Sequence, residues 1–323
     1  MRSLREFLYL ARDFWRFQTG NDYFRQPQGL GMYFQDKRCY YNDLRGKALW
    51  NGAFVENVPA LFVPSSRTNI VSPCMVLLWG LGNLDRFFLE KDPVFAQHVQ
   101  HAVSWLLAHV LPEGYWHSDI IRSDPGHYYY SNNSAMNQGL ALSFLTRVVE
   151  NQLVDASQEK QVLALMQKVF LNMLAPIQEG GTTLLRGNDL FLCEFSRKDG
   201  NVVLNGWIFA WFGLFDYVTF SHNPTAEKIS NQTVETMQLW LPKFQLPNGW
   251  SYYDSSGRCC SPHYHYLHIN LLDAMYRITG ITDFRENMRI LQKANTLLNR
   301  LRYTFKKIMD KMFRDSEAYS SQA

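Results

Sequence analysis

The chain has 323 residues, of which 46% are hydrophobic and 19% charged. This composition is typical of a globular protein with a sizeable core and excludes a disordered chain. The net charge of only +3 gives no indication of nucleic-acid binding. Aromatic residues make up 15%. Flat aromatic faces suit sugar rings, although most aromatic side chains belong to a core.

The cysteines and the start of the chain indicate a compartment. Five cysteines, an odd number without regular spacing, do not form the pattern of a secreted disulfide framework. Charges interrupt every apolar run of MRSLREFLYLARDFWRF, unlike a signal peptide. No run of ~18 uncharged apolar residues is present. We therefore expect a cytoplasmic protein.

Residues 1–68 are predicted to form a first region, a helix followed by a β-hairpin element. Residues 4–15 place Leu4, Phe7, Leu8, Ala11 and Trp15 on one helical face. The stretches GMYFQDKRCYYNDL and FVENVPALFVP have strand-like composition with Gly, Asn and Pro punctuation.

Residues 69–300 show a repeat of helix pairs. Helical periodicity covers eight segments, 70–89, 94–110, 133–150, 158–175, 202–220, 225–241, 263–279 and 284–313. Short links join the two helices of a pair, and long links separate the pairs. The first helices begin at intervals of about 60 to 70 residues, which indicates helical-hairpin repeats.

The first helix of each pair is apolar almost all round and the second is amphipathic, which predicts an inner and an outer ring. The predicted fold is therefore mainly α, an α/α toroid of about four hairpins. Two long links share Leu-Pro-x-Gly-aromatic, at LPEGYW and LPNGWS, and predict rim β-hairpins. The inner N-termini would all face this rim, which favours a bound anion.

Residues 301–323 are expected to form a basic helical extension and a disordered tail. The apolar positions 290, 294, 297, 301, 305, 308 and 312 make a helical stripe beside a basic side. An outer helix packed on the barrel explains this stripe. A membrane-surface or partner-binding helix is the alternative, and residues 4–15 pose the same choice.

The stretch NGWSYYDSSGRCCSPHYHYLHIN, residues 248–270, is rich in groups that could bind a metal. Adjacent cysteines are awkward ligands for one ion, and no metal-binding spacing is present, so we expect no metal. Polar residues at the starts of three inner helices favour a shared polar pocket instead, because an unpaired buried polar group costs ~1–3 kcal/mol. They are Asn137, Gln138, Asn205, Tyr264, His265, His268 and Asn270.

Four motifs within residues 130–295 resemble the C-terminal catalytic domain of D-glucuronyl C5-epimerases. They are SAMNQG at 134–139, Glu194 with VLNG at 203–206, YDSSG at 253–257 and YHYLHIN at 264–270. The resemblance implies an α/α barrel that inverts C5 of glucuronic acid units in a polymer to give iduronic acid, without an organic cofactor. Proton removal beside a carboxylate needs acid and base groups on opposite ring faces and neutralisation of that carboxylate.

Carried over by motif, Glu194 matches the family's functional glutamate and Tyr264 its tyrosine, and Tyr253 is a further candidate for catalysis. Arg186 and Arg258 lie on long links and are candidates to pair the uronate carboxylate. Trp116 and Trp250 are candidates to stack on neighbouring sugars. Gln138, Asn137, Asn205, His265, His268 and Asn270 would line the pocket.

The sequence also departs from the family. Phe195 stands where the family has a tyrosine, and a Tyr-Asp-Leu-Arg segment and the preceding β domain are missing. Tyr252, Tyr253 or residues 128–130 are candidates to replace the lost groups. The expected partner is a uronic-acid saccharide, with the basic ends suiting the inner membrane face; the oligomeric state stays open.

Two other functions stay open. A uronate lyase shares the proton abstraction, and a glycoside hydrolase would use two of Glu113, Asp119, Glu194 and Asp254. A catalytically inactive saccharide-binding barrel is the third alternative, and Phe195 is its main support.

Overall fold

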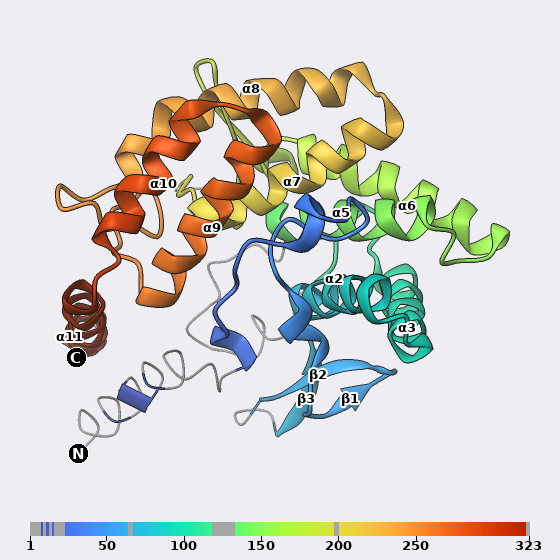
Figure 1. Cartoon of the computed structure of the whole chain (residues 1–323), viewed down its shortest axis with the longest axis horizontal. Helices are drawn as coiled ribbons and strands as arrows, with labels where there is room; N and C mark the ends of the chain where they lie inside the picture. Colours follow the sequence, from blue (N-terminus) through green and yellow to red (C-terminus); the bar gives the residue numbers. More distant parts are fainter. Residues whose placement is uncertain are drawn as a thin grey trace. The chain divides into compact units, whose positions relative to one another are not determined.

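The computed structural model describes residues 8, 11, 12, 15, 23–63, 67–117, 133–196 and 200–320; of residues 25, 63 and 311–320 it describes the backbone alone. The chain forms two compact units, and their helices and strands are labelled in Figure 1. One is Gly31–Leu239, and the other combines Met1–Leu30 with Trp240–Ala323.

Three helical hairpins build the unit Gly31–Leu239. They are α2 (Pro73–Glu90) with α3 (Pro93–His109), α5 (Ala135–Glu150) with α6 (Ala156–Leu174), and α7 (Leu204–Ser221) with α8 (Pro224–Trp240). The starts follow the expected chemistry, because Asp92 caps α3 and Asp155 caps α6 through backbone N–H groups. The predicted helix pairs are thus confirmed for these six helices.

Helices α5 and α7 cross at glycine. A Cβ at Gly139 would lie 2.5 Å from the Ala210 Cα and the Phe209 O, and one at Gly213 would overlap the Gly139 backbone. Further along both helices, Arg147 of α5 meets Asp216 of α7. The two helices therefore run in the same direction, and their N-termini lie at the same end.

The opposite end of these helices carries a buried ion pair. Arg147 Nη1 donates to Asp216 Oδ2 at 2.6 Å, and Ser143 Oγ donates to the same oxygen at 2.6 Å. Tyr41 Oη donates to Asp216 Oδ1 at 2.5 Å, and Arg147 Nε donates to the Cys39 carbonyl. The segment before α2 therefore seals this end with its own backbone and side chains.

The strands are few and short. β1 (Phe54–Val55), β2 (Val58–Val63) and β3 (Thr68–Val71) form an antiparallel sheet in the order β1-β2-β3. Glu56 and Asn57 have positive φ, as the two-residue turn between β1 and β2 requires. β4 (Thr183–Arg186) and β5 (Asp189–Leu192) form the hairpin in the second long link.

The strand prediction for residues 31–44 is wrong. This stretch contains a 3-10 turn, η2 (Met32–Phe34), and is followed by η3 (Arg45–Ala48). Tyr40 and Tyr41 are buried by packing: the Tyr41 ring centroid lies 4.4 Å from that of Tyr33 and 4.7 Å from that of Phe212. A strand-like composition here reflects burial.

The second unit contains α9 (Pro262–Thr279), α10 (Thr282–Ala294) and α11 (Leu297–Ser320), with η1 (Tyr23–Arg25) and η5 (Leu241–Phe244); η4 (Ile177–Glu179) belongs to the first unit. One helix was expected over 284–313, but it breaks between α10 and α11. Asn295 ends α10, and Thr296 Oγ1 accepts the Asn299 N–H at the start of α11. Both residues favour caps over helix interiors. Helix α11 extends to Ser320, and the disordered tail expected within residues 301–323 stays a prediction.

The two Leu-Pro-x-Gly-aromatic links make the same turn. Leu111 N–H donates to Tyr115 O and Gly114 N–H to Leu111 O, and Leu246 repeats the pattern with Trp250 and Gly249. Both glycines have positive φ. In residues 242–262 this turn continues as isolated bridges rather than the expected strands.

The mainly helical class with small strand hairpins is confirmed. Closure of four hairpins into one toroid stays a prediction, because α9 and α10 belong to the second unit. The boundaries predicted at residues 68 and 300 likewise stay predictions. No helix in the described part of the chain has the length and apolarity needed to cross a bilayer.

Candidate active site

Glu194 is placed by the strand that precedes it. The Cys193 N–H donates to Thr182 O at 2.9 Å, and the Cys193 carbonyl accepts the Ala135 N–H at 3.0 Å. Because Ala135 is the first residue of α5, the end of β5 is fixed to the start of that helix. The next residue, Glu194, is therefore held at the N-terminal end of α5.

The side chain of Glu194 lies against the first turn of α7. A Cβ at Gly206 would stand 2.5 Å from the Glu194 Cβ and 2.8 Å from its Cγ, and would overlap Oε2. Gly206 is the third residue of α7, so the carboxylate lies at the positive end of this helix dipole. The glycine of VLNG is needed because it leaves room for the glutamate.

A third helix start belongs to the same neighbourhood. Burial, and after it the charge of Glu194, raises the pKa of the Cys74 thiol to about 12. Cys74 is the second residue of α2. The starts of α2, α5 and α7 therefore converge around Glu194, as the repeat predicted for these three helices.

Lys47 was not found by sequence reasoning. It lies in η3, its side chain is 3% exposed, and its charge acts on Cys74 against the effect of Glu194. Lysines are rarely buried unless they serve an interaction. A lysine between Arg45 and Trp50 in a loop-like stretch gives no sequence signal that it is buried.

Two asparagines stand at the same helix ends. Asn205, the second residue of α7, is 3% exposed, and its Oδ1 has no hydrogen-bond partner among the described residues. Asn137 lies in the first turn of α5 and is half-buried. An unsatisfied buried carbonyl costs free energy. Asn205 is therefore suited to accept a hydrogen bond from a ligand hydroxyl.

Gln138 lies in a structural network rather than on a pocket wall. Its Nε2 donates to Asn133 Oδ1 at 3.0 Å and to Asn172 Oδ1 at 2.5 Å, and its Oε1 accepts from Thr182 Oγ1 at 3.1 Å. The side-chain amide is buried, and both its nitrogen and its oxygen are hydrogen-bonded. The predicted contact of Gln138 with substrate stays a prediction, and the structure shows these partners instead.

Tyr253 and Tyr264 lie together in the second unit. Their ring centroids are 4.8 Å apart, with an angle of 68° between the rings. Tyr264 is the third residue of α9, and Tyr253 lies in the preceding link. Arg258 and Lys307 lie over the Tyr253 ring, at 5.3 and 6.0 Å from its centroid. The structure thus joins two of the three predicted catalytic residues.

Arg258 is held by a buried carboxylate. Its guanidinium pairs with Asp254, whose Oδ1 also accepts from the Ser256 N–H and Oγ. Asp254 is fully buried. Arg258 thus acts on Tyr253 and Asp254, and its pairing with a uronate stays a prediction. Arg186 is exposed on the β4–β5 hairpin and donates to Gly200 O at 2.8 Å.

His265 lies at one end of a stack whose middle ring is Trp250. Its ring lies 3.8 Å from the Trp250 ring, and Tyr303 stacks on Trp250 at 4.5 Å. His265 Nδ1 accepts the Ser251 N–H at 3.1 Å, so Nε2 carries the proton and donates to Leu291 O at 3.0 Å. Burial lowers the pKa of His265 to about 4. This ring is neutral and held by its own unit, and its pocket role stays a prediction.

The two tryptophans are also structural. Trp250 is 0% and Trp116 2% exposed, and their Nε1 atoms donate to Cys260 O and Leu106 O. Both indoles are therefore enclosed by protein, and stacking on sugars stays a prediction that this burial does not support. The Leu-Pro-x-Gly-aromatic turns use these aromatic residues to anchor the links.

His268 and Asn270 complete the predicted set. His268 is fully buried, with Nδ1 3.7 Å from Cys260 Sγ, and burial lowers its pKa to about 3. Asn270 Nδ2 donates to Tyr266 O within α9. Within the described ranges, no group of three or more His, Cys, Asp or Glu is placed to hold a metal ion. Residues 119 and 128–130 lie outside the described residues.

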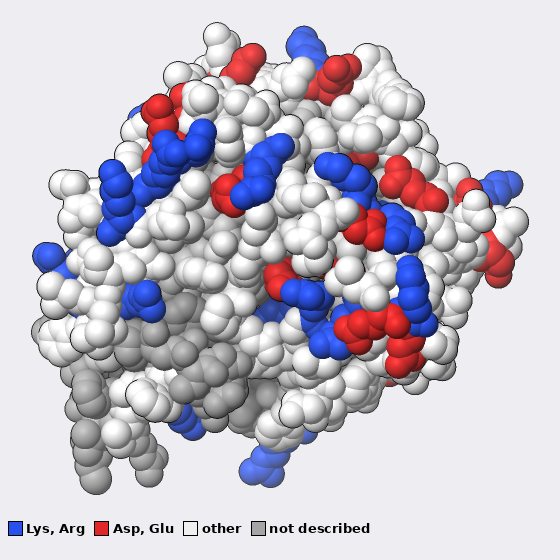
Figure 2. Space-filling view, viewed as in Figure 1, with Lys and Arg blue, Asp and Glu red and all other residues white. Residues whose placement is uncertain are grey.

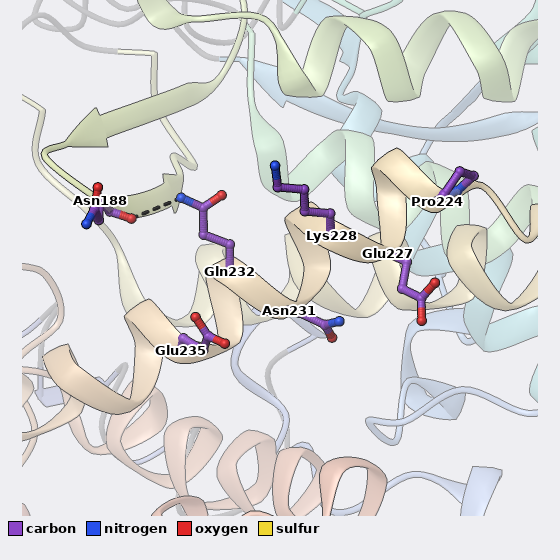
Figure 3. Close-up of a pocket in the computed structure, with 7 residues that line it drawn as sticks. All are labelled: Asn188, Pro224, Glu227, Lys228, Asn231, Gln232 and Glu235. Carbon is purple, nitrogen blue, oxygen red and sulfur yellow. Dashed lines mark hydrogen bonds between the residues drawn. The ribbon is translucent and has the colours of Figure 1, made fainter.

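A surface pocket of about 680 Å³ lies elsewhere, along α8 and the β4–β5 turn (Figure 3). Gln232 Nε2 donates to Asn188 O at 3.0 Å across it. Its lining is Asn188, Pro224, Glu227, Lys228, Asn231, Gln232 and Glu235. None of the predicted site residues lines it.

Two comparisons with known proteins give partial matches. An uncharacterized protein of Methanocaldococcus jannaschii is 28% identical over 109 residues, 32% of this chain and 35% of that protein. The match thus spans about a third of that relative's length. The solved structure of a UGL variant with dGlcA-Glc-Rha-Glc aligns at a TM-score of 0.43 and 12% identity, covering 68% of this chain and 61% of that one. A TM-score this low establishes no shared fold.

The sequence model of one family, described as D-glucuronyl C5-epimerase C-terminus, matches residues 122–293, just over half of the chain. The match contains Glu194, Gly206, Tyr253 and Tyr264. The chain belongs to this family.

Proposed function

We propose that the protein is a C5-epimerase of D-glucuronic acid units in a saccharide, giving L-iduronic acid. The observation that carries the proposal is the seat of Glu194 at the starts of α2, α5 and α7, within a chain of this family. Helix N-termini favour an anion, so this neighbourhood suits both a carboxylate side chain and a uronate.

The reaction needs three groups. A base removes the C5 proton, an acid returns a proton on the opposite ring face, and a cation or hydrogen bonds stabilise the charge that develops on the carboxylate. In our proposal Glu194 is one acid/base group and Tyr264 the other. Buried Lys47 supplies the positive charge for the uronate carboxylate, in place of the predicted Arg186 and Arg258.

Tyr253 supports Tyr264 in this scheme. The two rings touch, and Arg258 and Lys307 place positive charge beside the Tyr253 phenol. Positive charge stabilises a phenolate, which is the form that a tyrosine base requires. Tyr253 is therefore our candidate to replace the tyrosine that the family has at the position of Phe195.

The test is incubation with a glucuronate-containing polymer in deuterated water. An epimerase incorporates deuterium at C5 and leaves the chain intact, whereas a lyase creates an unsaturated end and a hydrolase a new reducing end. Asp254, one of the four carboxylates that a hydrolase could use, is buried and held by Arg258 and Ser256. Absence of exchange, with binding retained, would identify an inactive saccharide-binding protein.

Two variants test the residues. Glu194→Gln and Tyr264→Phe are each expected to abolish deuterium incorporation while the thermal unfolding curve stays that of the wild type. Glu159→Gln, in the first turn of α6, and Tyr276→Phe, in the last turns of α9, are matched controls that should keep full exchange. Full exchange in both test variants would refute the assignment.

A further inference from the structure

Helix α11 packs through one side. Tyr303 is 2% exposed, stacks on Trp250, and its hydroxyl accepts from Asn248 Nδ2 at 2.8 Å. Ile308 is also buried. At 100° per residue Ile308 lies about 140° round the helix from Tyr303, so the packed side of α11 runs from Tyr303 to Ile308 and ends beside Leu301.

Other apolar residues of α11 face water. Leu297 is 64%, Leu298 76%, Leu301 49% and Phe305 58% exposed. At 100° per residue, Leu298, Leu301 and Phe305 share a face that points away from Tyr303. Most of the stripe that an outer packed helix would bury is therefore exposed, and the packed-helix interpretation does not explain it.

Basic side chains border this face. Arg302 and Lys306 follow Leu301 and Phe305 by one position and are exposed, and the preceding helix α10 exposes Arg289 and Lys293. Charges of both signs are otherwise interspersed on the face of the molecule shown in Figure 2. An exposed apolar stripe with lysine and arginine beside it is the pattern of a helix that lies in a bilayer interface.

We propose that the α11 face formed by Leu298, Leu301 and Phe305 with Arg302 and Lys306 docks on an anionic lipid surface. Charge decides between this occupant and a second copy of the chain. A two-fold interface would set the same patch against itself and bring Arg302 and Lys306 close to their own equivalents. Anionic headgroups instead pair with these cations while the apolar side chains enter the acyl boundary.

The experiment is co-sedimentation of the full chain with vesicles. We expect binding to phosphatidylcholine vesicles with about one third phosphatidylserine, little binding to phosphatidylcholine alone, and loss of binding in about 1 M salt. Replacing Arg302 and Lys306 by Gln should weaken partitioning about fivefold for each charge. Replacing Leu298, Leu301 and Phe305 by Gln should remove it.

Matched variants separate this face from general surface effects. Leu171→Gln with Leu185→Gln removes exposed apolar side chains elsewhere, and Lys160→Gln with Lys168→Gln removes exposed charges elsewhere; both should bind as the wild type does. Equal binding of the α11 variants and the wild type would overturn the proposal. So would a concentration-dependent dimer, measured by sedimentation velocity, that the α11 variants lose. Exchange on a soluble saccharide should be unchanged in every α11 variant, so this proposal and the proposed function can fail separately.

Discussion

Glu194 occupies the space that a side chain at Gly206 would fill. The two residues are twelve positions apart, and the link between them crosses from the end of β5 to the first turn of α7. The glutamate and the glycine of this motif therefore depend on each other. Glu194 provides the carboxylate, and Gly206 leaves the space in which that carboxylate lies.

Gly206→Ala should reduce kcat/KM at least tenfold, because the new Cβ must displace the Glu194 carboxylate and small misplacements of a reacting group are costly. The measurement is C5 deuterium incorporation at several substrate concentrations. Gly29→Ala is the control, since a Cβ there meets nothing within 4 Å. Wild-type kinetics in Gly206→Ala would show that Glu194 takes no part in the reaction.

Lys47→Met should lower kcat/KM by roughly 10- to 100-fold, the range expected for loss of a hydrogen bond to a charged group. Lys47→Arg should keep part of the activity, because it keeps the charge with a different shape. Circular dichroism should show both variants folded. If Lys47→Met does not fold, Lys47→Arg alone tests the proposal. Full wild-type activity in Lys47→Arg, in which the charge is displaced, would contradict the proposed role of Lys47.

Asp85 makes the stability of the first unit pH-dependent. Burial raises its pKa from 3.8 to about 7, although the Tyr40 N–H donates to Oδ1 at 2.8 Å. The carboxyl is protonated in the folded state below pH 7, so its stabilising effect is complete below pH 3.8 and is lost as the pH rises through 7. Asp85→Asn keeps the acceptor and should flatten this dependence. Urea unfolding at pH 5 and pH 8 measures how the free energy of unfolding changes with pH. An equal change in the wild type and in Asp85→Asn would contradict the raised pKa of Asp85.

The second unit should respond to acid in the opposite sense. The folded pKa of His265, about 4, lies below the ordinary 6.5, so the stability it contributes is present above pH 6.5 and is lost as the pH falls through 4. Protonation would break the bond that His265 Nδ1 accepts from Ser251. Hydrogen exchange of residues 250–268 at pH 7 and pH 4.5 should show faster opening at the lower pH. His265→Asn should lose most of this difference.

Gly213→Ala should destabilise the chain by about 1–3 kcal/mol, because its Cβ would overlap the backbone of Gly139. Gly80→Ala is the comparison. Its Cβ would meet only the ring of Phe144, at 2.9 Å, and a side chain can shift where a backbone cannot. Gly213→Ala should therefore have a lower melting temperature than Gly80→Ala. The reverse order would show that α5 and α7 can separate.

The helix pairs were predictable because their signals are local. Asp92 and Asp155 cap the helices that follow them, and Pro73, Pro93 and Pro262 stand at first helical positions. Buried loop aromatics were not predictable. Tyr41 in a strand-like stretch is buried by contacts with α7, and no local pattern distinguishes that from pairing in a sheet.

The site was predictable only where a motif fixes geometry. Glu194 and Gly206 follow from VLNG and its neighbour, and the Tyr253–Tyr264 contact joins two motifs. Polarity alone does not decide the role of Gln138 and His265, because a polar residue at a helix start serves equally well to bind a neighbouring loop. Lys47 could not be found, since its burial depends on the packing of η3 against α2.

The sealed end of the first unit also sets where the chain can be cut. The family match begins at residue 122, yet Arg147 and Asp216 within it rely on Cys39 and Tyr41 before it. A fragment restricted to the matched residues would open this ion pair to water and remove α2 from the side of Phe144. The segment that matches the family model is therefore shorter than the segment that folds stably. A fragment cut at the family boundaries should be unstable.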